Sequence, residues 1–266
     1  MEKIRIDTLL HQQGKTESRE KARAIIMAGI VFLNGKRIDK PGTMVSAESE
    51  PEVRGAALPY VSRGGLKLEK ALSAFGVTPA DRCCLDAGAS TGGFTDCLLQ
   101  NGARHVYAVD VGYGQLNWNL RQDSRVTVLE RTNIRYLTAE TLAEKPSLVS
   151  IDVSFISLNL VLPAVHGLLL GDGADGEVIC LVKPQFEAGR GEVGKRGVVR
   201  DAAVHAKVLR KFLQQAADAG FGAVALDYSP IRGPEGNIEY LAYLQRGGVH
   251  AEFDIDAIVD ASHGVA

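Results

Sequence analysis

The 266-residue sequence has few of the features that mark secreted, membrane-embedded or metal-bound proteins. No secretory signal is expected, because the amino-terminal segment has no apolar core followed by a cleavage site. The longest apolar stretch, Ile156 to Leu170, contains Pro163 and His166 and is shorter than the roughly 20 residues of a membrane span. The four cysteines show neither a CxxC spacing nor histidines at metal-ligand spacing: Cys83, Cys84, Cys97 and Cys180. We therefore expect buried free thiols, no metal and a cytoplasmic protein.

A uniformly basic surface is also absent, since the formal net charge is −2. The charge is nevertheless uneven, because residues 1–47 carry nine Lys/Arg against five Asp/Glu and the other 219 residues carry 21 against 27. Apolar residues make up 45% of the chain, which is enough for a sizeable core and excludes a disordered protein. A basic amino-terminal part on an acidic body predicts an anionic partner for the basic part.

The amino-terminal part predicts two helices followed by a hairpin. Ile6, Leu9 and Leu10 have helical spacing, and Ala22, Ile25 and Ile26 repeat it. Ser18 is the expected N-cap of the second helix, and Gly29 its end. The Asn34-Gly35 pair between short apolar segments predicts a tight turn.

This order of elements, with RIDTLL, SREKARAIIMAGIVFLNGKRI and the turn, resembles a small RNA-binding module named after a ribosomal small-subunit protein, the S-four domain, over residues 4–50. Such modules hold structured RNA through its phosphates. A solvated basic helix face is the ordinary alternative. The residues expected to contact RNA in this part are Arg5, Arg19, Lys21, Arg23, Lys36, Arg37 and Lys40.

A change to acidic residues, Pro and Ala from residue 48 to residue 60 predicts a linker. We place the RNA-binding domain at 1–53, the linker at 54–60, the catalytic domain at 61–248 and an acidic tail without assigned function at 249–266.

After residue 80, apolar strands alternate with helices, which predicts an α/β fold with a mostly parallel, doubly wound sheet. The predicted strands are CCLDAGAS, HVYAVDVG, VTVLERT, SLVSIDVS, EVICLVKPQF, FGAVALDYSP and EYLAYLQRG. Helices are predicted at about 156–170 and at 202–219. The last two strands are too close for a helical crossover, so they should pair antiparallel.

Ligands bind such sheets beyond the carboxyl ends of the strands, where this chain has a glycine-rich turn and a second acidic residue. Asp110 ends the second strand, where a carboxylate can accept hydrogen bonds from ribose hydroxyls. The turn reads G-x-x-x-G-G rather than G-x-G-x-x-G, and Asp86 two positions before its first glycine suits a cationic cofactor end. S-adenosylmethionine is therefore favoured over a dinucleotide. The expected cofactor-binding residues are Asp86, Gly88, Ser90, Thr91, Gly92, Gly93, Phe94, Asp110, Val111, Gly112 and Asp152.

Four charged residues occupy positions at or near the ends of apolar elements: Lys67, Asp152, Lys183 and Glu239. Single charges there are costly unless they are paired. The strand positions of Asp152, Lys183 and Glu239 bring them to the same edge of the sheet. Ordinary salt bridges are the alternative.

Residues 60–246 resemble the FtsJ-type family of ribose 2′-O-methyltransferases, which share a Lys-Asp-Lys-Glu tetrad. The segments that match this tetrad are, in order, SRGGLKL, IDVS, VKPQFE and NIEYL. Lys67 takes the first position, with Lys70 one turn away as its rival. Together with the amino-terminal module, the chain resembles the TlyA family over nearly its full length. The resemblance implies a Rossmann-like methyltransferase that modifies a cytidine ribose in ribosomal RNA, and it makes Asn133 a contact of the adenine.

A sugar hydroxyl is a poor nucleophile at neutral pH and must lose its proton as it attacks. Lys183 is expected to take or stabilise this proton, while Asp152 and Glu239 hold its position. The glycine-rich loop at 187–200 follows Lys183 and could fold over the target nucleotide, or be a mobile surface loop. Further RNA contacts are expected from Arg63, Arg190, Lys195, Arg196 and Arg200.

Three other classes remain open. One is an RNA-binding or assembly factor with a degenerate methyltransferase fold, which the intact tetrad disfavours. A pore-forming haemolysin is suggested only by the older family name and lacks a membrane segment. An NAD-dependent dehydrogenase is the weakest. No membrane and no obligate protein partner is predicted.

Overall fold

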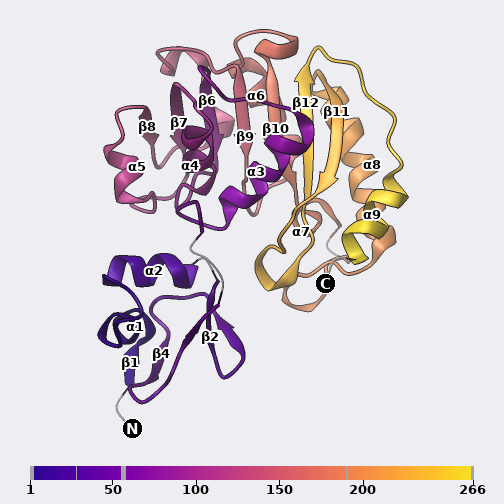
Figure 1. Cartoon of the computed structure of the whole chain (residues 1–266). Coiled ribbons are helices and arrows are strands. Elements are labelled where there is room, and N and C mark those ends of the chain that lie inside the picture. Colours follow the sequence, from indigo (N-terminus) through magenta and orange to yellow (C-terminus); the bar gives the residue numbers. More distant parts are fainter. Residues whose placement is uncertain (1–2, 28, 55–57, 190, 265–266) are drawn as a thin grey trace. The chain divides into compact units, whose positions relative to one another are not determined.

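The computed structural model describes residues 3–27, 29–54, 58–189 and 191–264. The chain divides into two compact units, Met1–Gly65 and Leu66–Ala266. Figure 1 shows both units along the chain. The elements given first below belong to the smaller unit, and the seven-stranded sheet belongs to the larger one.

The smaller unit packs two helices on short strands. Its elements are β1 (Lys3–Arg5), α1 (Ile6–Gln12), α2 (Arg19–Met27), β2 (Val31–Leu33), β3 (Lys36–Ile38), β4 (Met44–Ser46) and β5 (Glu52–Val53). Strand β1 pairs with β4, and β2 pairs with both β3 and β5. The apolar residues with helical spacing form its core, with Ile6, Leu10 and Ile26 fully buried.

The predicted local signals of the smaller unit are confirmed. The backbone N–H of Lys21 donates to Oγ of Ser18 at 3.1 Å, so Ser18 caps α2. Asn34 and Gly35 both have positive φ, 50° and 75°, as a tight hairpin turn requires. The segment from residue 48 to residue 60 is partly structured, because β5 pairs with β2. The predicted linker at 54–60 includes residues 55–57, which lie outside the described residues.

The larger unit contains a seven-stranded sheet in the order β11-β12-β10-β9-β6-β7-β8. Its strands are β6 (Cys83–Ala87), β7 (His105–Val109), β8 (Val126–Leu129), β9 (Leu148–Ile151), β10 (Glu177–Val182), β11 (Phe221–Tyr228) and β12 (Tyr240–Arg246). The pairs among β6, β7, β8, β9 and β10 are parallel, and β12 is antiparallel to both of its neighbours. The predicted doubly wound sheet and its antiparallel end are therefore confirmed.

The helices of the larger unit are α3 (Gly64–Phe75), α4 (Gly93–Gln100), α5 (Trp118–Gln122), α6 (Leu162–Leu168), α7 (Pro184–Glu187), α8 (Ala202–Asp218) and α9 (Ile255–Gly264). Short 3-10 turns lie at Ile134–Tyr136, Ala139–Thr141, Leu158–Leu160, Gly173–Asp175, Lys195–Gly197 and Pro234–Gly236. The acidic tail is not separate from the fold, since α9 packs on α8 and β11 (Figure 1). Ile255 and Val259 of α9 join the main apolar core.

Two predicted boundaries are wrong. The apolar segment at 156–170 is not one helix, because a 3-10 turn at Leu158–Leu160 precedes α6, which covers only Leu162–Leu168. The carboxylate of Glu187 accepts the N–H of Leu158 at 2.7 Å, and Ser157 caps the 3-10 turn. Helical structure therefore begins once at Leu158 and again at Leu162. Glu239 does not begin the last strand but directly precedes it.

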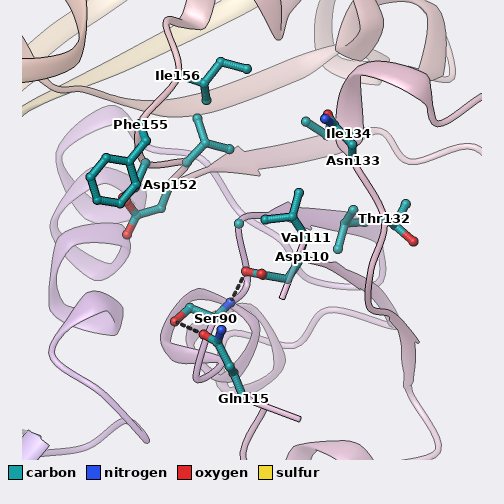
Figure 2. A pocket seen from close by; sticks show the side chains of 14 residues that line it. Ser90, Asp110, Val111, Gln115, Thr132, Asn133, Ile134, Asp152, Phe155 and Ile156 are labelled. Atoms are coloured by element: carbon teal, nitrogen blue, oxygen red, sulfur yellow. Dashed lines mark hydrogen bonds between the residues drawn. The ribbon is translucent and has the colours of Figure 1, made fainter. Parts of the chain in front are cut away.

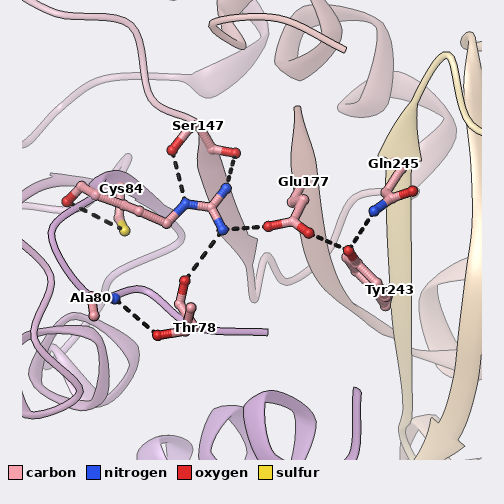
Figure 3. A network of polar contacts seen from close by, with 8 residues as sticks. Thr78, Ala80, Cys84, Ser147, Glu177, Tyr243 and Gln245 are labelled. Atoms are coloured by element: carbon pink, nitrogen blue, oxygen red, sulfur yellow. Dashed lines mark hydrogen bonds and ion pairs between the residues drawn. The ribbon is translucent and has the colours of Figure 1, made fainter. Parts of the chain in front are cut away.

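A buried polar network lies at the edge of the sheet where β9 and β10 begin (Figure 3). Arg82 forms an ion pair with Glu177 and also donates to the hydroxyl of Ser147 at 2.9 Å. Glu177 accepts a further bond from the hydroxyl of Tyr243 on β12. The network connects the amino ends of β6, β9 and β10 to β12. It therefore lies away from the carboxyl ends of the parallel strands, where ligands bind such sheets.

Candidate active site

The four charged residues predicted to act together meet as two buried ion pairs. Nζ of Lys67 lies 2.5 Å from Oε2 of Glu239, and Nζ of Lys183 lies 2.5 Å from Oδ1 of Asp152. The side chain of Glu239 has no exposed surface, and those of Lys67 and Lys183 are 9% and 7% exposed. Each charge thus has an opposite charge in contact, as burial demands.

The two pairs are electrostatically linked through Asp152. Burial acts to raise the pKa of this carboxyl, but the charges of Lys183 and Lys67 and the hydrogen bond from Lys183 hold its pKa below the ordinary value. Asp152 therefore carries a negative charge that both lysines stabilise. Nζ of Lys183 also donates to the carbonyl of Val153 at 2.9 Å and to Oγ of Ser154 at 3.2 Å, which fixes its position at the end of β10.

A cavity of about 460 Å³ opens at the carboxyl ends of β6, β7 and β9, within the size range of small-ligand sites (Figure 2). Six residues predicted to bind the cofactor line it: Gly88, Ser90, Asp110, Val111, Asn133 and Asp152. Asp152 thus belongs both to the cavity and to the ion pairs, and it joins the two parts of the site.

Asp110 organises the loops around the cavity. Its Oδ2 accepts the backbone N–H of Ser90 at 2.8 Å, and its Oδ1 accepts the N–H of Gly112 at 2.6 Å. Gly112 itself borders a small hollow next to the cavity, together with Ser90 and Asp110. Each carboxylate oxygen can accept a second bond, so Asp110 remains able to bind ribose hydroxyls.

Gly88 shows why the turn after β6 needs a glycine. Its φ is 91°, and a Cβ atom there would lie 2.6 Å from the carbonyl oxygen of Asp152. The ends of β6 and β9 therefore approach too closely for any side chain. This close approach places the cavity directly beside Asp152.

Most of the other predicted cofactor residues do not line the cavity. Asp86, Thr91, Gly92, Gly93 and Phe94 are not among the residues that line it. Asp86 is fully buried and accepts hydrogen bonds from Thr95 at 2.7 Å and from Ser150 at 3.4 Å. Burial raises the pKa of Asp86 to about 7, and the charge of Asp152 adds to this. A contact of Asp86 with a cationic cofactor end stays a prediction.

The sequence interpretation missed several lining residues: Val109, Gln115, Thr132, Ile134, Val153, Ser154, Phe155 and Ile156. Most of them adjoin residues that were named, so extending each strand end by two or three positions would have found them. Gln115 gave no such signal. The fold brings its side-chain oxygen to 3.4 Å from the hydroxyl of Ser90. Phe155 has a φ of 64° and is 90% exposed at the rim.

The basic residues predicted to contact RNA in the smaller unit are exposed, except for the half-buried Arg63. Asp7, which is fully buried, holds two of them: Arg5 at 2.7 Å and Arg19 at 3.5 Å. Arg37 and Arg63 both pack beside Gly29. The fold therefore brings Arg37 of β3 and Arg63, which precedes α3, to the same glycine.

In the larger unit, Lys195, Arg196 and Arg200 are exposed and line a hollow of about 490 Å³. Arg190 lies outside the described residues. Within the part of the chain that the structure describes, no helix is both long and apolar enough to cross a membrane. The same residues contain no cluster of three or more His, Cys, Asp or Glu that could hold a metal ion.

The sheet order, with an antiparallel strand inserted beside a parallel set and a cavity at the strand ends, is that of the Rossmann-like methyltransferase fold. Residues 60–246 match the model of the FtsJ-like methyltransferases, and residues 4–50 match the S4 domain. The chain belongs to the FtsJ-like methyltransferase family and, within it, to the TlyA group.

Three relatives illustrate the similarity. The 16S/23S rRNA (cytidine-2′-O)-methyltransferase TlyA of Mycobacterium tuberculosis is 47% identical over 91% of this chain and 90% of its own length. Hemolysin A of Brachyspira hyodysenteriae is 44% identical over 91% of this chain and 99% of its own. A solved structure from Streptococcus thermophilus, of a protein named as a hemolysin, has a TM-score of 0.78 at 49% identity and covers 99% of this chain and 96% of its own.

Proposed function

We propose that the protein transfers a methyl group from S-adenosylmethionine to the 2′-hydroxyl of a cytidine ribose in ribosomal RNA. The observation that carries the proposal is the pairing of Lys67 with Glu239 and of Lys183 with Asp152 beside one cavity. The TlyA enzymes that this chain resembles over most of its length are named for this reaction.

The cavity suits S-adenosylmethionine in size and in the groups that it presents. Asp110 offers carboxylate oxygens for the ribose hydroxyls, and Val111, Ile134 and Ile156 offer apolar surface to the adenine. Asp152 supplies negative charge at the end nearest the lysines, where a cationic sulfonium is favoured. When bound, S-adenosylmethionine supplies an electrophilic methyl group.

The remaining chemistry falls to the two lysines and their carboxylate partners. The ribose 2′-hydroxyl would have to lose its proton as its oxygen accepts the methyl group that bound S-adenosylmethionine would supply. As the ammonium that pairs with Asp152, Lys183 would stabilise the negative charge on the oxygen while its proton leaves to solvent, and only as a neutral amine would it take that proton itself. Asp152 and Glu239 keep the two amines in place, so that little reorganisation is needed during the reaction.

The smaller unit and the loop at 187–200 are assigned to RNA. Exposed Arg and Lys side chains on both would bind phosphates and supply affinity rather than sequence selection. Ribosomal RNA or a ribosomal subunit is the partner we propose, without membrane or obligate protein partner.

The test combines methyl transfer with mapping of the product. Purified protein is incubated with ribosomal subunits and labelled S-adenosylmethionine, and 2′-O-methyl positions are mapped. We expect label at a cytidine, and a loss of about a thousandfold in rate for Lys183→Ala with cofactor affinity kept within a few fold. Cofactor binding without transfer to any ribosomal RNA would instead indicate a binding or assembly factor.

A further inference from the structure

Two buried side chains bind the backbone of Val199, in the loop that follows Lys183. Its N–H donates to Oδ1 of Asn237 at 3.2 Å, and its carbonyl lies 3.0 Å from Nε2 of His205. A carbonyl only accepts, so His205 carries its proton on Nε2 and accepts at Nδ1 from the hydroxyl of Tyr240, 2.8 Å away. Both polar groups of one buried peptide segment are therefore bound to fixed elements.

Asn237 makes a second bond to the same loop. Its Nδ2 donates to the carbonyl of Gly197 at 3.0 Å. The backbone carbonyl of Asn237 accepts the N–H of Gly233 at 2.8 Å. The residue is only 4% exposed. An amide is needed here, because one side chain must donate to a carbonyl and accept from an N–H at the same time. Asn237 thus links the loop at 194–201 to the segment at 229–239.

The segment at 229–239 ends on Glu239, which pairs with Lys67. Gly233 lies so close to Glu239 that a Cβ atom on it would be 2.2 Å from Oε1. The carbonyl of Glu239 also accepts the N–H of Ser229 at 2.8 Å. The turn that contains Gly233 therefore contacts the carboxylate of Glu239, and the backbone of Asn237 binds this turn.

The other side of the link carries cations. Lys195, Arg196 and Arg200 are exposed around the hollow of about 490 Å³, on either side of Val199. Long basic side chains on an unanchored loop would lose conformational entropy on binding a phosphate, and anchoring the backbone reduces this cost. The bonds to Asn237 and His205 supply that anchoring.

We propose that Asn237 is a positioning residue, which fixes the cations of the loop at 194–201 in register with Glu239 so that an RNA phosphodiester binds the loop while the neighbouring ribose meets the ion pairs. This inference rests on the proposed function. Tyr240 and Ser262, whose hydroxyls lie 3.0 Å apart, connect His205 to α9 and so give the carboxy-terminal helix a part in holding the loop.

The experiment compares full-length Asn237→Ala, Asn237→Asp and Arg200→Ala with the double variant Asn237→Ala/Arg200→Ala. Asn237→Asp keeps the shape but loses the donor to Gly197. Ser147→Ala is the matched control, because it removes a buried hydrogen bond at the opposite edge of the sheet. Rates at varied RNA concentration, RNA affinity at several salt concentrations, S-adenosylmethionine affinity and thermal unfolding are measured.

We expect Asn237→Ala and Asn237→Asp to raise KM for RNA about tenfold, with a smaller fall in kcat and unchanged S-adenosylmethionine affinity. The salt dependence of RNA affinity should become shallower, as it does when a phosphate contact is lost. The double variant should bind RNA hardly more weakly than either single variant, since both act through the loop. Ser147→Ala should lower the unfolding temperature and leave KM for RNA, kcat and both affinities unchanged.

Independent, additive effects of Asn237→Ala and Arg200→Ala would overturn the inference, as would an unchanged KM in both Asn237 variants. Equal losses in Ser147→Ala would reduce Asn237 to a purely structural role. A wild-type protein that binds ribosomal RNA but never methylates it would instead contradict the proposed function, and RNA affinity would still decide whether Asn237 positions the loop.

Discussion

Nζ of Lys67 donates to Oε2 of Glu239 across 172 positions of sequence, and the pair joins the helix before the first strand of the sheet to the segment before β12. Because the side chain of Glu239 has no exposed surface and that of Lys67 is 9% exposed, the ion pair offsets part of the cost of burying each charge. Removing one partner leaves the other charge buried without its ion pair, whereas removing both does not.

This pair predicts a strongly non-additive result. Lys67→Met and Glu239→Gln should each lower the free energy of unfolding by about 3 kcal/mol, and the double variant should cost clearly less than their sum. All three should lose methyl transfer. Denaturant unfolding measures the energies, and additive costs would show that the two residues do not depend on each other.

From the contacts of Asp110 we expect its replacement to weaken cofactor binding alone. Asp110→Ala removes the acceptor for two backbone N–H groups and for the ribose, so S-adenosylmethionine affinity should fall about 10- to 100-fold. Calorimetric titration measures it. Asp172→Ala, which removes an exposed carboxylate paired with Arg246, is the control and should bind normally. Equal affinities in the two variants would contradict the assignment of the cavity.

Asp86 predicts a pH dependence of stability. The folded protein keeps its carboxyl protonated up to a pKa of about 7, whereas the unfolded chain releases the proton near pH 4. The folded state thus binds more protons in between, and its free energy of unfolding should fall by about 1 kcal/mol per pH unit from pH 4 to pH 7 through this group. Asp86→Asn should remove that part of the slope in urea unfolding at several pH values. An unchanged slope would place the pKa of Asp86 near its ordinary value.

The Arg82–Glu177 pair predicts a loss of stability without loss of binding (Figure 3). Glu177→Ala takes the carboxylate away from the largely buried guanidinium of Arg82, so the free energy of unfolding should fall by about 3 kcal/mol. S-adenosylmethionine affinity below the unfolding temperature should not change, because the network lies at the edge of the sheet opposite the cavity. A parallel loss of affinity would mean that the two edges are coupled.

The local structure followed from the sequence where its signals are short-range. Ser18, the Asn34-Gly35 turn and the alternation of apolar strands with helices each depend on neighbours in the chain, and each was predicted correctly. The segment at 156–170 was not, because its division depends on Glu187, a residue nearly 30 positions away that caps Leu158. Propensity within the segment carries no trace of that contact.

The order of strands and helices, the basic amino-terminal module and the four charged residues near the ends of apolar elements could all be predicted from the residues alone. Hydrophobic periodicity and single charges in apolar runs are properties of the sequence. The pairing of the charges, the burial of Asp86 away from the lining of the cavity, and the bonds from Asn237 to the basic loop became visible only in the folded structure. Such facts depend on distances between segments far apart in the chain, which the packing of the sheet and its loops sets.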